Sequence, residues 1–243
     1  MSVWYCIPSA RPASEAQACV DAWRAMGYCV AVWRDIGADL LDCDYSRYGE
    51  YPGYARAVNA LAADVLAIDT ACDWIVTGGD DVFPDKTKLA EEIAAGCSAH
   101  FRAYRTVMLH SFSQSETYGV MQPTGDRFAD GSIDRIAGSP WMGREWCQRA
   151  HGGTGPLHQN FTHMHVDEAL QGAAMAQGVF WQRPDLTQLH RHFMRESDDI
   201  NSPAVGKPIP AHLVKANSAA HWNESKSIFE RIKRGGFAEC LPV

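Results

Sequence analysis

The central segment of this 243-residue chain reads Trp74-Ile75-Val76-Thr77-Gly78-Gly79-Asp80-Asp81-Val82-Phe83-Pro84-Asp85. It opens with an apolar run of the length of a buried strand, and two glycines then favour a tight turn. Two adjacent carboxylates follow the turn. Acids just after a central strand lie where open α/β sheets bind ligands, although the same letters also suit a solvated turn. The segment therefore indicates an α/β sheet and leaves the role of the acids open.

The rest of the chain predicts an α/β fold around a mostly parallel central sheet. Strands are expected over residues 3–7, 28–33, 74–76, 106–110 and 179–181, with an extended segment over 186–193. Helices are expected over residues 14–26, 54–70, 88–95, 143–150, 166–177 and 223–233. Residues 36–53 and 111–140 have the composition of loops, the latter with short strands. Helices that alternate with strands are typical of parallel sheets, and we expect Ser14 to cap the first helix.

The bulk composition indicates a soluble globular protein. Hydrophobic residues make up 46% and charged residues 21% of the chain, which suffices for a full core. No apolar run approaches the ~20 residues that cross a bilayer, and the N-terminus lacks an export signal. None of the eight cysteines form a Cys-x-x-Cys pair, which indicates reduced thiols. We therefore expect a cytoplasmic protein without a membrane partner.

The charge is unevenly distributed along the chain. The formal net charge of −7 argues against broad nonspecific binding of nucleic acids. Residues 207–243, however, carry six Lys and Arg against three Glu. This net positive tail is either a phosphate-contacting surface or a solvated helix face.

Three groups of side chains are candidates for chemistry: Asp80-Asp81, Asp167-Glu168, and His190 with His192. If Asp81 and one late histidine bind the same divalent ion, they offer oxygen and imidazole ligands, which suit Mn²⁺ and, less well, Mg²⁺. Such an ion would stabilise a diphosphate leaving group. A carboxylate at the N-terminus of the 166–177 helix could then take the proton of an attacking hydroxyl.

Each group also has a structural interpretation. Asp167 and Glu168 fit the first turn of a helix, where negative charges complement the helix dipole. The two late histidines could be hydrogen-bonded imidazoles on a strand. His163 and His165 could join them in a zinc site, but no suitably spaced thiolate and no catalytic zinc motif are present.

The arrangement resembles the GT-A glycosyltransferase fold. Thr77-Gly78-Gly79-Asp80-Asp81-Val82 resembles its aspartate-rich metal motif, Val166-Asp167-Glu168-Ala169-Leu170 its catalytic-base segment, and His190 or His192 its late metal-binding histidine. Further segments resemble, in the same order, the bacteriophage glycosyltransferases associated with TET/JBP-type oxygenases. These are Gln122-Pro123-Thr124-Gly125-Asp126-Arg127-Phe128, Gly138-Ser139-Pro140-Trp141-Met142-Gly143-Arg144-Glu145-Trp146, His163-Met164-His165-Val166-Asp167-Glu168, Arg183-Pro184-Asp185-Leu186 and His190-Arg191-His192. The resemblance covers roughly residues 3–195.

The resemblance implies an inverting transfer of a sugar from a nucleotide-diphosphate donor, a UDP-sugar, to a hydroxyl, with Mn²⁺ or Mg²⁺ as cofactor. Members of the phage group are thought to modify hydroxymethylated pyrimidines in phage DNA. The implied acceptor is therefore 5-hydroxymethylcytosine in DNA, and the compartment is the host cytoplasm. The alternatives are a GT-A enzyme acting on a polysaccharide or protein, and a nonenzymatic nucleotide-sugar-binding protein. Residues 1–195 would form the GT-A domain (nucleotide-sugar half 1–110, acceptor half 111–195), with 196–243 a C-terminal extension packed on it.

The resemblance also implies roles for individual residues. Asp81 and His190 or His192 would bind the ion, and Asp167, with Glu168 beside it, would be the general base. Donor binding would fall to Pro8, Arg11, Asp35, Arg56, Asn59 and Asp80, with Asp35 accepting from a uracil N–H. The sugar and acceptor pocket would be shaped by Asp126, Arg127, Ser139, Pro140 and Trp141, the last offering a flat apolar face. Gly79 departs from the pattern, because it replaces the first acid of an Asp-x-Asp motif.

Overall fold

The computed structural model describes residues 1–108, 116–128, 138–209, 214 and 218–242. Its central sheet has seven strands in the order β3-β2-β1-β4-β7-β6-β8. They are β1 (Ser2–Pro8), β2 (Cys29–Arg34), β3 (Tyr45–Tyr48), β4 (Cys72–Val76), β6 (Val120–Pro123), β7 (Trp141–Gly143) and β8 (Phe180–Arg183). Both pairings of β7 are antiparallel, and the other described pairings in this sheet are parallel. The predicted α/β class with a mostly parallel sheet is confirmed.

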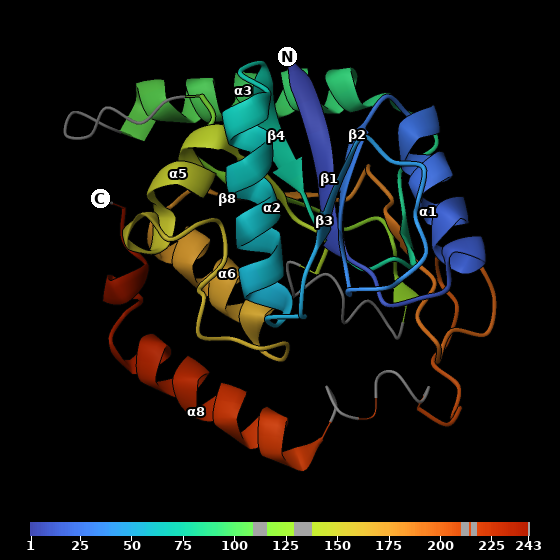
Figure 1. Ribbon diagram of the computed structural model, residues 1–243. Coiled ribbons are helices and arrows are strands. Elements are labelled where there is room, and N and C mark those ends of the chain that lie inside the picture. Colours follow the sequence, from blue (N-terminus) through green and yellow to red (C-terminus); the bar gives the residue numbers. More distant parts are fainter. Residues whose placement is uncertain (109–115, 129–137, 210–213, 215–217, 243) are drawn as a thin grey trace.

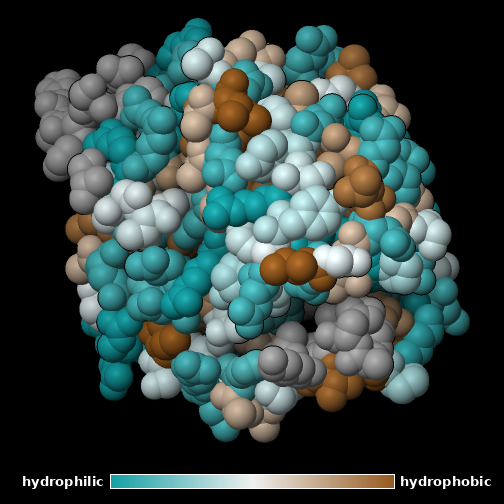
Figure 2. Space-filling model, in the orientation of Figure 1, coloured by the Kyte–Doolittle hydropathy of each residue, from teal (hydrophilic) through white to brown (hydrophobic). Residues whose placement is uncertain are grey.

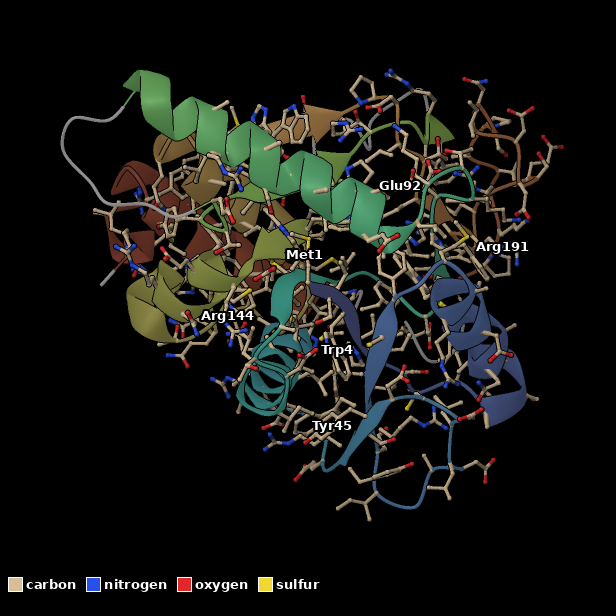
Figure 3. All side chains as sticks on the ribbon, turned by 90° about the horizontal axis from the view of Figure 1, so that it is seen from above. Met1, Trp4, Tyr45, Glu92, Arg144 and Arg191 are labelled. Carbon is tan, nitrogen blue, oxygen red and sulfur yellow. The ribbon has the colours of Figure 1, made fainter. Side chains whose placement is uncertain are left out.

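Helices cover both faces of this sheet (Figure 1). They are α1 (Ala13–Ala25), α2 (Tyr54–Ile68), α3 (Ala90–Met108), α5 (Arg144–Gly153), α6 (Val166–Ala176) and α8 (Ala219–Arg234), followed by the short 3-10 helix η2 (Ala238–Cys240). Seen from above, α2 and α5 lie on one side of the sheet, and α1 and α3 on the other (Figure 3).

The strand order reverses between β1 and β4. The chain runs outward from β1 through α1 to β2 and β3, and then returns through α2 to β4 on the other side of β1. Right-handed crossovers in opposite directions place their helices on opposite faces, and open α/β sheets commonly bind ligands where the order reverses. Residues 9–12 follow β1 at this point of the sheet, and the Asp80-Asp81 turn follows β4.

The core contradicts part of the predicted acceptor pocket. Trp141 on β7 is fully buried, and its indole N–H donates to Gln188 Oε1 (2.6 Å). Ser139 is 5% exposed, and its carbonyl accepts from Gln188 Nε2 (2.9 Å). Pro140 is also buried, and its carbonyl accepts from the backbone N–H of Thr77 (3.2 Å). The flat apolar face of Trp141 is therefore covered in this structure, because its strand lies between β4 and β6 in the core.

Three local predictions also differ from the structure. Thr106–Met108 belong to α3 rather than to a strand, while residues 109 and 110 lie outside the described residues. The segment predicted as a loop over 36–53 contains the edge strand β3, paired with β2. Ser14 does not cap α1, because Pro12 occupies the N-cap position without a side-chain cap.

The C-terminal segment packs on the domain, as predicted. Helix α8 contacts α6 and crosses the lower edge of Figure 1. Its Ile232 is 1% exposed and Cys240 is fully buried, so both belong to the main core. Figure 2 shows a largely polar face with scattered single apolar side chains. Among the described helices, none combines the length and apolar character that crossing a membrane requires.

Candidate active site

A tight turn after β4 carries the two predicted acids. The carbonyl of Gly79 accepts from the backbone N–H of Val82 (3.1 Å), so the acids occupy the central turn positions. The Tyr5 hydroxyl donates to the same Gly79 carbonyl (2.6 Å). The Trp23 indole N–H donates to the Val82 carbonyl (2.7 Å), and its ring stacks on Tyr5 with centroids 3.8 Å apart. Strand β1 and helix α1 therefore fix the turn.

The geometry of the turn explains the missing first acid. A Cβ added at Gly79 would collide with Asp81 Oδ1, and one at Gly78 would stand 2.9 Å from the Tyr5 hydroxyl. The glycine at position 79 therefore lets the Asp81 carboxylate lie over its own turn, and a larger residue there would require this carboxylate to move.

Arg11 pairs with both acids and offsets part of their charge. Its Nε donates to Asp80 Oδ1 (2.7 Å) and its Nη2 to Asp81 Oδ2 (3.0 Å). The Ser9 hydroxyl donates to the other oxygen of Asp80 (2.7 Å). Burial disfavours the charged form of Arg11, but the charge and hydrogen bond of Asp80 outweigh it and raise the pKa of Arg11. The structure thus joins the loop after β1 to the turn after β4.

Arg34, which the sequence analysis did not single out, holds this loop. It is 2% exposed, and its guanidinium donates to the carbonyls of Ser9 (3.1 Å), Arg11 (2.7 Å) and Asp39 (3.1 Å). The available signal was an arginine at the end of an otherwise apolar strand, since arginine is almost never fully buried without partners.

The antiparallel pairing of β5 (Val82–Phe83) with β9 (Leu189–His190) brings a late histidine to the turn. His190 Nε2 lies 3.4 Å from Asp81 Oδ1, and the backbone N–H of Arg191 donates to the Asp81 carbonyl (2.8 Å). Burial alone raises the pKa of Asp81, but the hydrogen bond and charge of His190, with the charge of Arg11, outweigh it and lower that pKa.

The Asp81–His190 pair has the spacing of two ligands of one divalent ion. Ligand atoms about 2.1 Å from an ion, at neighbouring coordination positions, stand roughly 3 Å apart or slightly more. His192 lies farther back, with its ring centroid 5.1 Å from that of His190 and its Nδ1 accepting from the N–H of Met194 (3.2 Å). Among the described residues, no three His, Cys, Asp or Glu side chains form a metal-binding group, for zinc or any other ion. Two protein ligands fit an ion whose other ligands are phosphate and water.

A buried ion pair holds the backbone of His190. Asp126 Oδ2 accepts from the His190 N–H (3.0 Å), and Arg195 Nε donates to the His190 carbonyl (2.8 Å). Asp126 and Arg195 also pair with each other, and both side chains are 3% exposed. Asp126 was predicted to shape the acceptor pocket. In the structure it is buried and positions the backbone of His190. The neighbouring Arg127 is exposed, and its backbone N–H donates to the Ile200 carbonyl (2.7 Å).

Asp167 lies in the first turn of α6, near Tyr54. The Tyr54 hydroxyl contacts Thr77 Oγ1 (3.0 Å) and donates to the Gly78 carbonyl (3.1 Å). Burial raises the pKa of Tyr54, and the charges of Asp167 and Asp81 both add to this. The phenol thus lies within electrostatic reach of both acids. Burial and the charge of Glu168 raise the pKa of Asp167, which suits a carboxylate that accepts a proton.

Glu168 has a different partner. Its carboxylate pairs with Nδ1 of His165, which precedes α6 in a left-handed conformation (φ 62°). The His165 ring lies between Trp222 and Phe229 of α8, with centroid distances of 4.7 and 5.6 Å. Of the two acids predicted as the base, Glu168 is paired with a histidine, whereas Asp167 accepts from the Glu168 N–H (3.0 Å), and we take Asp167 as the candidate.

Two predicted donor-binding residues serve the scaffold. Asn59 donates to the carbonyls of Leu157 (2.7 Å) and Thr154 (3.2 Å), and its Oδ1 accepts from the Leu157 N–H (2.9 Å). Arg56 Nε donates to the Gln159 carbonyl (3.1 Å). Their contacts are therefore with the loop after α5, and the structure does not bring them to the Asp81 turn. A cavity of about 380 Å³ lies beside Asn59, between α2 and α5.

The other residues predicted to bind the nucleotide sugar lie at the sheet edge that follows β1 and β2. Pro8 closes β1 in register with Trp33 of β2, and Asp35 is exposed just after β2. Burial and the charge of Asp35 raise the pKa of Tyr51 to about 12, so this tyrosine lies near Asp35. The edge around Arg11 thus has an exposed acid on its outer side.

No protein-family model matches the sequence, and no curated protein matches it. Among solved structures, the chain is similar to the catalytic domain of Drosophila beta1,4galactosyltransferase 7 in complex with xylobiose. The TM-score is 0.45 at 10% identity, over 89% of this chain and 79% of that chain. At these values we base neither fold nor function on the likeness; the α/β class rests on the sheet itself.

Proposed function

We propose that the protein is a metal-dependent, inverting glycosyltransferase of the GT-A type that moves a sugar from a UDP-sugar to a hydroxyl. The single observation that carries the proposal is the Asp81–His190 pair, 3.4 Å apart, at the strand-order reversal of the sheet. Arg11, in the loop after β1, donates to Asp81 in this turn. The charges of Asp167 and Asp81 both act on Tyr54. The pattern agrees with the sequence resemblance to GT-A enzymes.

The chain's own residues supply binding and proton transfer. Asp81 and His190 would hold Mn²⁺ or Mg²⁺, which when bound stabilises the negative charge of a departing diphosphate. Arg11 is a second cation within reach of that charge, since it lies 3.0 Å from Asp81. Asp167 would take the proton of the acceptor hydroxyl while its oxygen bonds to the anomeric carbon. The bond from that carbon to the diphosphate breaks on the opposite face, which inverts the configuration.

For the acceptor, we propose 5-hydroxymethylcytosine in DNA. The support is the ordered set of segments that resembles the phage DNA glycosyltransferases, together with the basic side chains of α8. Lys226, Lys233 and Arg234 are exposed on this helix. Reaching the hydroxymethyl group requires entry into the major groove or extrusion of the base.

The acid limb of the pH–rate profile should report Asp167. Because its pKa is raised and the base must be ionised, kcat/KM should fall as the pH drops through that pKa, above the usual range of aspartate. Asp81 has a lowered pKa and stays ionised in this range, but the His190 imidazole must also be neutral to bind the ion, so donor binding is measured beside the rate to separate the two titrations. Parallel measurement of kcat/KM and UDP-sugar binding from pH 4.5 to 8 checks this. A flat profile, or a loss of rate that follows donor binding, would contradict the assignment.

The proposed activity is tested with radiolabelled nucleotide sugars and Mn²⁺. The acceptors are a DNA duplex containing 5-hydroxymethylcytosine, the same duplex with cytosine, and an oligosaccharide. We expect label only in the hydroxymethylated DNA, with one UDP released per sugar. Incorporation into the oligosaccharide alone would move the acceptor to a glycan. A thermal shift with UDP and Mn²⁺ but no release of UDP under any condition would indicate a binding protein.

A further inference from the structure

The N-terminal turn of α8 reaches the part of the molecule where Asp167 lies. Ser218 caps this helix by accepting from the His221 N–H (3.4 Å). His221 acts electrostatically on His163, whose pKa is lowered by burial and by that neighbour. The His163 ring in turn lies edge-on to Tyr54, with centroids 6.1 Å apart. A short series of contacts thus links α8 to the tyrosine that lies near Asp81 and Asp167.

Trp222, in the first turn of α8, is more exposed than the other tryptophans of this protein. Of the eight tryptophans, six are buried, Trp181 is half-buried, and Trp222 is 46% exposed. The inward side of α8 includes Ser225 and Ile232, which are 3% and 1% exposed, and the partly buried Phe229. Trp222 continues this side at helical spacing, so one part of its ring packs inward and the rest is open.

The inward part of the ring contacts the residue that precedes the proposed base segment. The Trp222 centroid lies 4.7 Å from that of His165, whose Nδ1 binds Glu168, the neighbour of Asp167. The His165 side chain is 9% exposed, and its Nε2 is buried without a hydrogen-bond partner in the described structure. The indole therefore lies beside the residue that begins α6, with one part of its ring packed on His165 and the rest open.

We propose that Trp222 is the aromatic platform on which the acceptor base stacks, the role that Trp141, buried in the core, cannot fill. This inference rests on the proposed function and adds a specificity-determining residue to it. An indole face binds a nucleobase through stacking that does not depend on base sequence. Lys226 lies one turn farther along α8 and is exposed, as a contact to the phosphate backbone requires.

Two variants and a control separate this role from a structural one. Trp222→Ala should raise the KM for single-stranded DNA containing 5-hydroxymethylcytosine by about 10- to 100-fold, the range expected for loss of one base stack. Its kcat at saturating acceptor should fall by a much smaller factor than the KM rises, because the stacked base is bound before the sugar is transferred. Trp222→Phe keeps a flat ring and should restore most of the affinity. Met175→Ala removes a side chain that is 59% exposed at the other end of α6 and should change nothing.

A binding measurement tests the platform independently of catalysis. Acrylamide should quench mainly Trp222, because it is the most exposed tryptophan. A 12-nucleotide strand with one 5-hydroxymethylcytosine should protect this fluorescence in wild type and have no such effect on Trp222→Phe. An unchanged KM in Trp222→Ala, or quenching that the oligonucleotide leaves unaltered, would overturn the proposal even if the enzyme transfers sugar. Protection by maltohexaose instead would assign the platform to a glycan. Absence of any UDP release, with protection intact, would overturn the proposed function and leave the platform supported.

Discussion

Replacing Asp167 by Asn should lower kcat by about 10²- to 10⁴-fold, the usual contribution of a general base. The variant keeps the shape of the side chain but cannot accept the acceptor's proton. Binding of the UDP-sugar should change little, because the Asp81–His190 pair and Arg11 are untouched. Steady-state kinetics and calorimetric titration with the donor check the two parts of this result.

The same variant should be more stable than wild type near neutral pH. The folded-state pKa of Asp167 is raised, so the folded state binds this proton more tightly than the unfolded chain does. Ionisation of Asp167 therefore costs stability as the pH rises through its folded pKa, and Asn removes that cost. Below the unfolded pKa the difference should disappear. Lost turnover with a raised Tm at pH 7.5 is typical of a residue kept for function.

Glu168→Gln is the matched control for the base assignment. Its partner His165 packs against α8, so we expect a modest loss of stability. The activity of Glu168→Gln should stay well above that of Asp167→Asn. If Glu168→Gln is inactive while Asp167→Asn turns over normally, the base is Glu168 instead.

Replacing Asp126 by Ala should destabilise the fold by about 3–5 kcal/mol, because it leaves the Arg195 guanidinium buried without its carboxylate. Urea denaturation measures this. The double change Asp126→Leu with Arg195→Met should cost less than Asp126→Ala alone, since it leaves no uncompensated buried charge. Lys88→Gln removes an exposed ion pair with Asp185 and should cost less than about 1 kcal/mol.

Asp126→Ala should also weaken binding of the ion. The Asp126 carboxylate accepts from the His190 backbone, and residues that orient a metal ligand typically contribute 10- to 100-fold to metal affinity. Titration of the folded Asp126→Ala variant with Mn²⁺, in the absence of urea, checks this. Equal Mn²⁺ affinity in wild type and variant would mean that Asp126 serves stability alone.

Much of the fold follows from local sequence patterns, and the predictions that were wrong have physical reasons. Strands β1, β2 and β4 are largely buried on both faces, so each contains an apolar run that a single sequence reveals, although β2 ends in Arg34 and β4 includes Asp73. β3 is a partly exposed edge strand without such a run, and it was missed. Thr106 and Val107 favour strands by propensity, but the helix that starts at Ala90 continues through them.

The candidate site was less predictable, because its parts meet through tertiary pairing. No local pattern pairs Val82 with His190, and it is this β5–β9 pairing that favours His190 over His192 in our proposal. Ser139, Pro140 and Trp141 belong to a segment whose burial depends on its neighbours β4 and β6. Tyr54 lacked any distinguishing signal at the start of an ordinary helix.

The central claim is that Asp81 and His190 together hold a divalent ion. Electron paramagnetic resonance of free Mn²⁺, with UDP present, measures this directly in wild type, Asp81→Asn, His190→Ala and His192→Ala. We predict one bound Mn²⁺ per chain in wild type, at least tenfold weaker binding in the first two variants, and a smaller loss in His192→Ala. Wild-type affinity in both Asp81→Asn and His190→Ala would contradict the account.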